Sequence, residues 1–119
     1  MPVLRVISGP DLGATAEVDQ HPVSIGRGSD CGLRVTDEFV SLIHSLVEPV
    51  EGGFRLRDLE SSNGTIVNGE SVTELSLRLG DLISLGKTTI LFGSGNEETD
   101  IETVGSAETP MPGDLDLAP

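Results

Sequence analysis

The sequence predicts an all-β domain, a twisted antiparallel β-sandwich of short strands, followed by an acidic tail. Apolar and polar residues alternate in short runs, and Gly, Pro, Asn or Asp interrupts them about every eight to twelve residues. No window of about eleven residues keeps a helical spacing of apolar side chains that is free of Gly and Pro. Short runs of this kind are typical of sandwiches and barrels.

Each expected strand is a run of β-favouring residues between turn residues. The early runs are bounded by Gly9-Pro10 and Pro22, and cover residues 3–7, 14–18 and 23–25. The middle runs follow Gly32, His44 and Gly53, and the last of them alternates with a clear period of two: 33–35, 45–48 and 54–59. The late runs are separated by Gly80-Asp81 and Gly86-Lys87, and cover 75–79, 82–85 and 88–92.

The composition changes after residue 93. Residues 94–119 carry seven acidic residues, no basic residue and three of the seven prolines. Such a segment buries too little apolar surface to order itself. We therefore expect a globular domain at 1–93 and a disordered acidic tail or linker at 94–119.

The charge and the aromatic content argue against several classes of partner. The chain has 20 acidic against 7 basic residues and neither Trp nor Tyr. It therefore repels polyanions and lacks platforms for stacking bases, so we expect no direct binding of nucleic acid. The chain has a single cysteine, Cys31, and shows neither a secretion signal nor an apolar run of about 18 residues. These features predict a reduced, cytoplasmic protein without membrane association.

Enzymatic motifs are absent or incomplete. Gly86-Lys87-Thr88 resembles the end of a P-loop and Gly26-Arg27-Gly28 the start of a dinucleotide fingerprint, but the glycine spacing is wrong and no helix follows either. Two histidines and one cysteine, widely spaced, give no metal site. Ser41 and His44 are three residues apart in an extended segment and so face opposite ways. We expect no enzyme, metal or cofactor.

Two Asn-Gly pairs, Asn63-Gly64 and Asn68-Gly69, lie too close together for both to connect full strands, so at least one shapes a surface loop. Arg27, Ser41 and Ser62-Asn63 would bring donors from three loops to one end of a sandwich. This pattern is compatible with an anion site and equally with solvated loop residues. His44 is better read as a buried ring bonded to nearby backbone than as a base.

Residues 23–92 resemble a bacterial forkhead-associated (FHA) domain. The resemblance rests on four ordered blocks: Ile25-Gly26-Arg27, Val40 to Ser45, Asp58 to Gly69, and Leu79 to Gly86. Gly9 to Gly13 is also similar to the first hairpin of the family. The resemblance implies a sandwich of two twisted sheets with about eleven strands, and a module that binds phosphothreonine peptides in Ser/Thr-kinase signalling. Such domains often precede transcription activators, and this chain would be the N-terminal part of a larger regulatory protein.

The resemblance also implies roles for individual residues. Arg27 would clamp the phosphate, with hydroxyl contacts from Ser41 and Ser62, and Asn63 would hold the peptide main chain. Residues that shape these loops would be Gly26, His44, Gly64 and Asn68.

Leu42 departs from the family pattern, which usually has Arg, Lys or Asn directly after the serine. The phosphate would lose a donor worth about 1.5–3 kcal/mol. The alternative function is therefore a phosphate-independent protein–protein interaction through the same loops.

Overall fold

The computed structural model describes residues 2–95, so the expected disordered tail lies largely outside the described residues. Residues 2–95 contain no helix and form eleven strands. Their bounds are β1 Val3–Ser8, β2 Thr15–Glu17, β3 Val23–Gly26, β4 Leu33–Arg34, β5 Ser45–Val50, β6 Gly53–Asp58, β7 Thr65–Val67, β8 Glu70–Val72, β9 Glu74–Leu77, β10 Leu82–Leu85 and β11 Thr88–Gly93. The predicted all-β class is confirmed.

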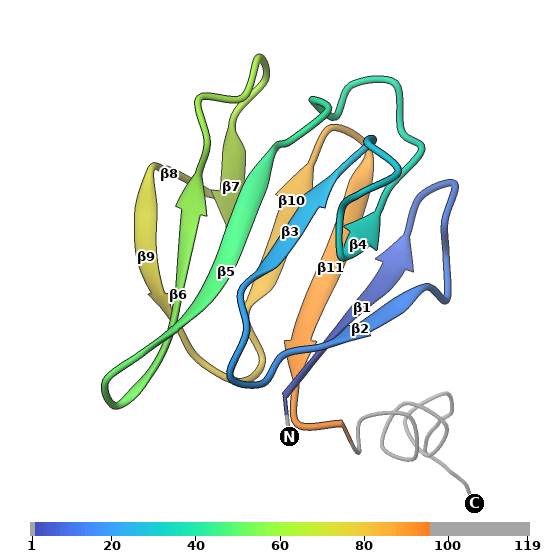
Figure 1. Ribbon diagram of the computed structural model, residues 1–119. Helices are drawn as coiled ribbons and strands as arrows, with labels where there is room; N and C mark the ends of the chain where they lie inside the picture. The colour runs from blue at the N-terminus through green and yellow to red at the C-terminus, as the bar shows by residue number, and fades with distance from the viewer. Residues whose placement is uncertain (1, 96–119) are drawn as a thin grey trace, which may run out of the picture.

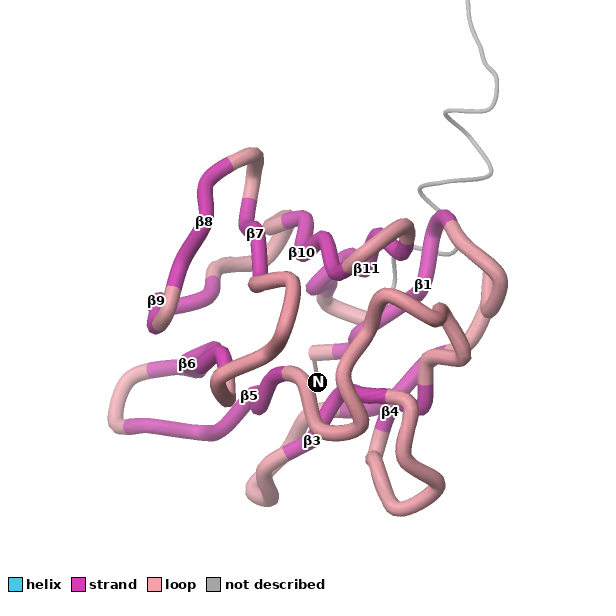
Figure 2. The backbone as a smooth tube through the Cα atoms, turned by 90° about the horizontal axis from the view of Figure 1, so that it is seen from above, coloured by secondary structure: helices cyan, strands magenta, loops and turns pink. Residues whose placement is uncertain are grey.

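The strands form two facing sheets (Figures 1 and 2). One sheet has the order β2-β1-β11-β10-β7-β8, and the other β4-β3-β5-β6-β9. The paired strands run antiparallel, with one exception: β3 and β4 pair in parallel, with Ile25 opposite Leu33. This pair departs from the purely antiparallel sandwich that the sequence suggested.

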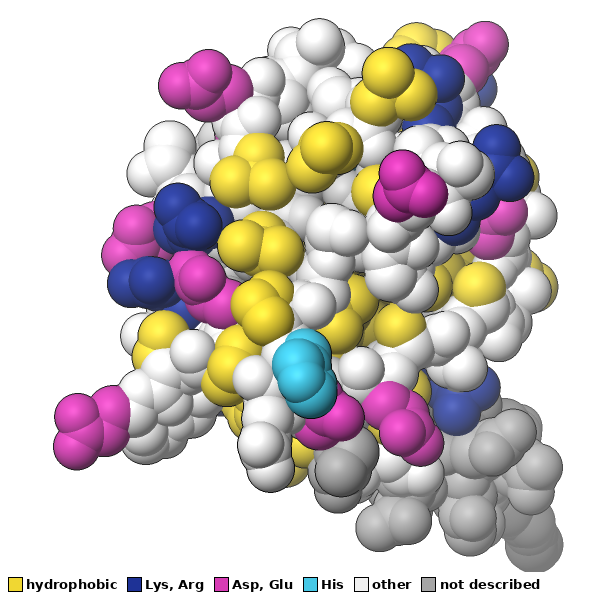
Figure 3. Space-filling model, in the orientation of Figure 1, with side chains coloured by type: hydrophobic (Ala, Val, Ile, Leu, Met, Phe, Trp, Pro, Cys, Tyr) yellow, Lys and Arg dark blue, Asp and Glu magenta, His cyan; other side chains and the backbone are white. Residues whose placement is uncertain are grey.

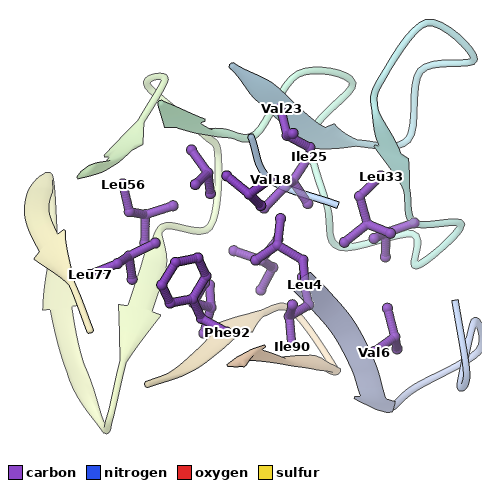
Figure 4. Close-up of a cluster of buried hydrophobic side chains, with 14 of the residues drawn as sticks. Leu4, Val6, Val18, Val23, Ile25, Leu33, Leu56, Leu77, Ile90 and Phe92 are labelled. Atoms are coloured by element: carbon purple, nitrogen blue, oxygen red, sulfur yellow. The ribbon is translucent and has the colours of Figure 1, made fainter. Parts of the chain in front are cut away.

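Alternate residues of each strand point between the sheets and make the core (Figure 4). In β11, for example, Thr88, Ile90 and Phe92 are buried while the residues between them are partly exposed. The ring of Phe92 meets Phe54 of the opposite sheet edge-on, with centroids 5.8 Å apart. The buried apolar set draws on both sheets and on the loops that join them: Leu4, Val6, Val18, Val23, Ile25, Leu33, Val35, Val40, Val47, Leu56, Val67, Leu77, Ile83, Leu85, Ile90 and Phe92.

The two Asn-Gly pairs have different roles. Asn68 and Gly69 have φ of 51° and 88° and form the two-residue turn between β7 and β8, in which Val67 pairs with Glu70. Gly64, with φ of 86°, lies in the loop between β6 and β7. One pair therefore connects strands and the other shapes a loop.

The sandwich has two distinct ends. Val3 pairs with Gly93, so β1 begins beside the point where β11 ends (Figure 1). The opposite end carries the connections β3–β4, β4–β5, β6–β7 and β10–β11. This end holds the candidate site.

Candidate functional site

The β4–β5 loop is fixed to the end of β3 by backbone hydrogen bonds. The N–H groups of Arg27 and Gly28 donate to the carbonyls of Ser41 and Leu42, at 3.1 and 3.0 Å. Gly26 is required by this close approach, because a Cβ there would lie 2.2 Å from the carbonyl oxygen of Leu42. Arg27 and Ser41 are thus neighbours by backbone geometry alone.

The side chain of Arg27 is half-buried and uses only one of its nitrogen atoms in a hydrogen bond within the domain. Its Nε donates to the carbonyl of Val40. Among the ion pairs of residues 2–95, none involves Arg27. The two Nη groups therefore stay available for an external acceptor with forked geometry.

The β6–β7 loop is tied to the same place. The N–H of Ser62 donates to Oγ of Ser41 at 3.0 Å, and Nδ2 of Asn63 donates to the carbonyl of Phe39 at 2.7 Å. The hydroxyl of Ser41 accepts in this bond, so its proton is free to donate outward. The structure thus brings together Arg27, Ser41, Ser62 and Asn63.

His44 connects the β4–β5 loop to the β6–β7 loop and is fully buried. Its Nδ1 accepts from the N–H of Ser41 at 3.0 Å, while Nε2 lies 2.8 Å from the carbonyl of Gly64. A carbonyl only accepts, so Nε2 carries the proton and the ring is the neutral Nε2–H tautomer. The ring nitrogen meets the backbone of Ser41 instead of its hydroxyl, which is not the arrangement of a nucleophile and its base.

Asp58 organises the β6–β7 loop from the end of β6. Its carboxylate accepts from the N–H and hydroxyl of Ser61, and from Thr65 Oγ1 at 2.6 Å. Ser61 in turn accepts from the N–H of Gly64 at 2.9 Å. Burial acts to raise the pKa of Asp58, but the bonds from Ser61 and Thr65 outweigh it and hold the pKa below its ordinary value.

Asp37 is a second organising carboxylate, which the sequence reasoning missed. It is buried and accepts from the N–H groups of Phe39 and Lys87, at 2.9 and 2.7 Å, and from Thr88 Oγ1 at 2.9 Å. Burial opposes its ionisation, yet these three bonds hold the pKa of Asp37 below its usual value. Asp37 thereby draws the β10–β11 turn against the β4–β5 loop. Fifty residues separate Asp37 from Lys87, so no local sequence pattern reveals the link.

Asn68 and Leu42, which were also named from the sequence, are placed differently from the four donor residues. Asn68 is at the other end of β7 from Gly64, where it donates to Asp81 and accepts from the N–H of Leu82, both at 3.0 Å. It fixes the β7–β8 turn to β10 and makes no hydrogen bond with Arg27 or Ser41 among the described residues. Leu42 lies in the β4–β5 loop with its side chain 60% exposed.

The site therefore offers a guanidinium, two serine hydroxyls and an amide, all on braced loops. Such donors suit an anion with several oxygens. Within residues 2–95 no group of three or more His, Cys, Asp or Glu side chains could hold a metal ion. In the same range no helix has the length and apolar composition that a membrane crossing needs.

Comparison with known proteins decides the family. A family model described as "Inner membrane component of T3SS, cytoplasmic domain" matches residues 5–96. A chain from a structural and functional study of phosphothreonine-dependent FHA domain interactions superposes with a TM-score of 0.71 at 33% identity, covering 78% of this chain and 95% of that one. The chain belongs to the forkhead-associated domain family. The FhaA FHA domain, solved in complex with the intracellular domain of Rv3910, gives a TM-score of 0.70 at 34% identity, covering 77% of this chain and 99% of that one.

Curated relatives are longer than the matched FHA domain. Glycogen accumulation regulator GarA of Mycolicibacterium smegmatis is 35% identical over 98 residues, which are 82% of this chain and 62% of GarA. An ABC transporter ATP-binding/permease protein of Mycobacterium tuberculosis is 34% identical over 93 residues, which are 75% of this chain and 11% of the transporter. The chain thus spans less than two thirds of these relatives.

Proposed function

We propose that this FHA domain binds phosphothreonine-containing segments of partner proteins that Ser/Thr kinases modify. The observation that carries the proposal is Arg27, whose Nη groups lack a partner among the described residues and whose backbone N–H bonds to the carbonyl of Ser41. A dianionic phosphate needs several donors at once, and a guanidinium gives a forked pair. The phosphothreonine-dependent interactions named for a relative of the same fold support this function.

Each of the four candidate residues has a role in this proposal. Arg27 holds the phosphate, the hydroxyls of Ser41 and Ser62 donate to its oxygens, and Asn63 holds the peptide main chain. The net charge of −13 opposes any anion at long range. Recognition therefore depends on these short-range donors instead of on steering by the whole molecule.

A second candidate function is phosphate-independent protein binding through the same loops. Leu42 and Ile43 are adjacent and expose 60% and 58% of their surfaces, although both are large and apolar. Hydrophobic side chains continue from the loops down the face of the sheet that contains β3 and β5 (Figure 3). An apolar partner surface would cover Leu42, whereas a phosphate would gain nothing from it.

Titration calorimetry with one peptide in phosphothreonine and threonine forms separates these functions. Arg27→Ala should weaken phosphopeptide binding by at least about 2 kcal/mol, because the phosphate loses its forked partner. Arg78→Ala is the control, since it also removes one arginine but at an exposed position at the start of the β9–β10 turn. Equal affinity of wild type and Arg27→Ala for the phosphopeptide would refute the phosphate site. Equal affinity for the two peptide forms would favour the second function.

The broader role follows from the same reading. We propose that the domain carries out no chemistry of its own, acts in the cytoplasm and needs no cofactor. It would recruit a phosphorylated protein to a larger regulatory assembly, of which transcription regulators are one kind. We propose that this domain binds neither nucleic acid nor membranes, because the chain is strongly acidic and repels other anionic surfaces.

A further inference from the structure

Strands β8 and β9 are the outer strands of the two sheets on the same side of the sandwich (Figure 2). A hollow of about 300 Å³ lies beside them, and its lining includes Val67, Val72 and Leu75 from β7, β8 and β9. This volume is at the lower end of the range of ligand pockets. It suits one or two side chains of an approaching segment.

The hydrogen-bond register shows which backbone groups of β9 are free of β6. The N–H of Asp58 donates to the carbonyl of Thr73 at 2.9 Å, in the register that continues along β6 and β9. Bonded positions alternate in an antiparallel ladder, so every second residue after Thr73 bonds to β6. The N–H and C=O groups of Glu74 and Ser76 therefore point away from β6. No strand of residues 2–95 lies beyond β9 in this sheet, so these groups form a free edge on which another strand can pair.

A strand added along β9 would place its side chains in alternating environments. Directly opposite residues of neighbouring strands share a face of the sheet. The side chains of Glu74 and Ser76 are exposed, whereas Leu75 is partly buried and lines the hollow. The residue opposite Leu75 would therefore enter the hollow beside Val67 and Val72, and its two neighbours would stay on the outer surface.

The charges beside the edge favour a basic segment. The side chain of Glu74 is 56% exposed and lies 3.5 Å from Nη1 of Arg55, so its carboxylate can accept a second cation. Two carboxylates, of Glu70 and Asp81, and the guanidinium of Arg78 also border the hollow. The whole chain has a net charge of −13, which attracts a basic segment and opposes pairing with a second copy of the chain.

We propose that the free edge of β9 binds an extended segment of a partner protein as an additional strand. The segment carries an aliphatic side chain opposite Leu75 and a Lys or Arg opposite Glu74. Backbone hydrogen bonds to Glu74 and Ser76 give the affinity, and the hollow and the carboxylates give the selectivity. This binding does not use Arg27, so it is independent of the proposed phosphothreonine site.

A library of random, unphosphorylated peptides of seven residues, selected on the full chain, tests the proposal. Wild type should enrich peptides with an aliphatic residue next to Lys or Arg. When an enriched peptide is bound, the amide protons of Glu74 and Ser76 should exchange with solvent at least about tenfold more slowly, because they gain carbonyl partners. N-methylation of the peptide, one residue at a time, should prevent binding at every second position, since alternate N–H groups of an added strand face β9.

Variants of the edge provide a second test. Ser76→Pro removes an edge N–H without removing a bond to β6, so it should weaken the enriched peptide about tenfold. Thr15→Pro is the matched control at the edge of β2: the N–H of Val6 donates to the carbonyl of Ala14, so the N–H of Thr15 points away from β1. Glu74→Lys should replace the basic preference by an acidic one, and its exposure makes it a safe variant if thermal melts show that Ser76→Pro is unfolded.

The contrary outcomes are equally specific. The proposal is overturned if no peptide is enriched, if N-methylation shows no period of two, or if Glu74→Lys selects the same peptides as wild type. It is also overturned if the bound peptide shifts only amide signals near Arg27. Sedimentation that shows self-association of the free chain, with Glu74 and Ser76 already protected, would assign the edge to a second copy and overturn the partner. Arg27→Ala should bind the enriched peptide as wild type does, whatever it does to a phosphopeptide.

Discussion

Replacing His44 should loosen the binding loops and destabilise the fold in measurable steps. The ring makes two hydrogen bonds, to the N–H of Ser41 and the carbonyl of Gly64, and is fully buried. Each buried polar group left without a partner costs about 1–3 kcal/mol. His44→Ala leaves both groups without this partner, so it should lose about 2–4 kcal/mol of unfolding free energy. For a domain of this size that corresponds to roughly 10–25 °C in melting temperature.

Two conservative variants divide this loss. The amide oxygen of His44→Asn can accept from Ser41 as Nδ1 does, and the amide nitrogen of His44→Gln can donate to Gly64 as Nε2 does. Each should therefore recover about half of the stability that His44→Ala loses. His44→Asn releases the loop that carries Asn63, so it should also weaken phosphopeptide binding more than its stability loss suggests.

Urea denaturation and calorimetry on the same samples provide the measurements. His21→Ala is the matched control, because the side chain of His21 is 85% exposed and its Nδ1 lies 3.4 Å from Oδ1 of nearby Asp19. If His44→Ala unfolds at the same urea concentration as His21→Ala, the ring does not brace the loops. The same conclusion follows if Asn and Gln at this position are no better than Ala.

Three further changes test other parts of the site. Asp58→Asn should lower stability at pH 7 by roughly 1.5–3 kcal/mol. Because folding depresses the pKa of Asp58, the stability that its carboxylate contributes is present above the ordinary pKa of 3.8 and is lost as the pH falls, so the urea melts of Asp58→Asn and wild type should converge between pH 7 and pH 3. Leu42→Arg should tighten phosphopeptide binding about tenfold by calorimetry, and no change would place position 42 outside the site. Gly26→Ala should lower the free energy of unfolding by about 1–3 kcal/mol in the same melts, because the added Cβ would lie 2.2 Å from the carbonyl oxygen of Leu42. Gly53→Ala is the control and should cause no such loss, because a Cβ at Gly53 would have no atom within 4 Å.

Most of the sandwich can be predicted from the sequence, because long runs such as 54–59 show their alternation directly. The sequence predicts no strand at β7 or β8, because the turn residues Asn68-Gly69 split this segment into two runs of three residues each. Their signal was the turn Asn68-Gly69, whose positive φ at both residues favours a hairpin. The parallel pairing of β4 is equally hidden, since two residues carry no information about strand direction.

The candidate site was only half visible in the sequence. Arg27, Ser41 and Asn63 stand out as donors in loops, and the structure places them together. Asp37 did not stand out, because a buried carboxylate looks like any exposed one until its distant partners are known. Asp58 did carry a local signal, because aspartate side chains often bond to the backbone just beyond them and so favour turns.

The pairing of Val3 with Gly93 has a mechanical consequence. A force that pulls the two chain ends apart acts across β1 and β11 at their common end, and so breaks their hydrogen bonds one at a time, like opening a zipper. A force between a ligand on the far loops and either chain end acts along the strands and loads many bonds together. The domain is therefore built to hold its ligand under tension better than it resists being peeled open from its own ends.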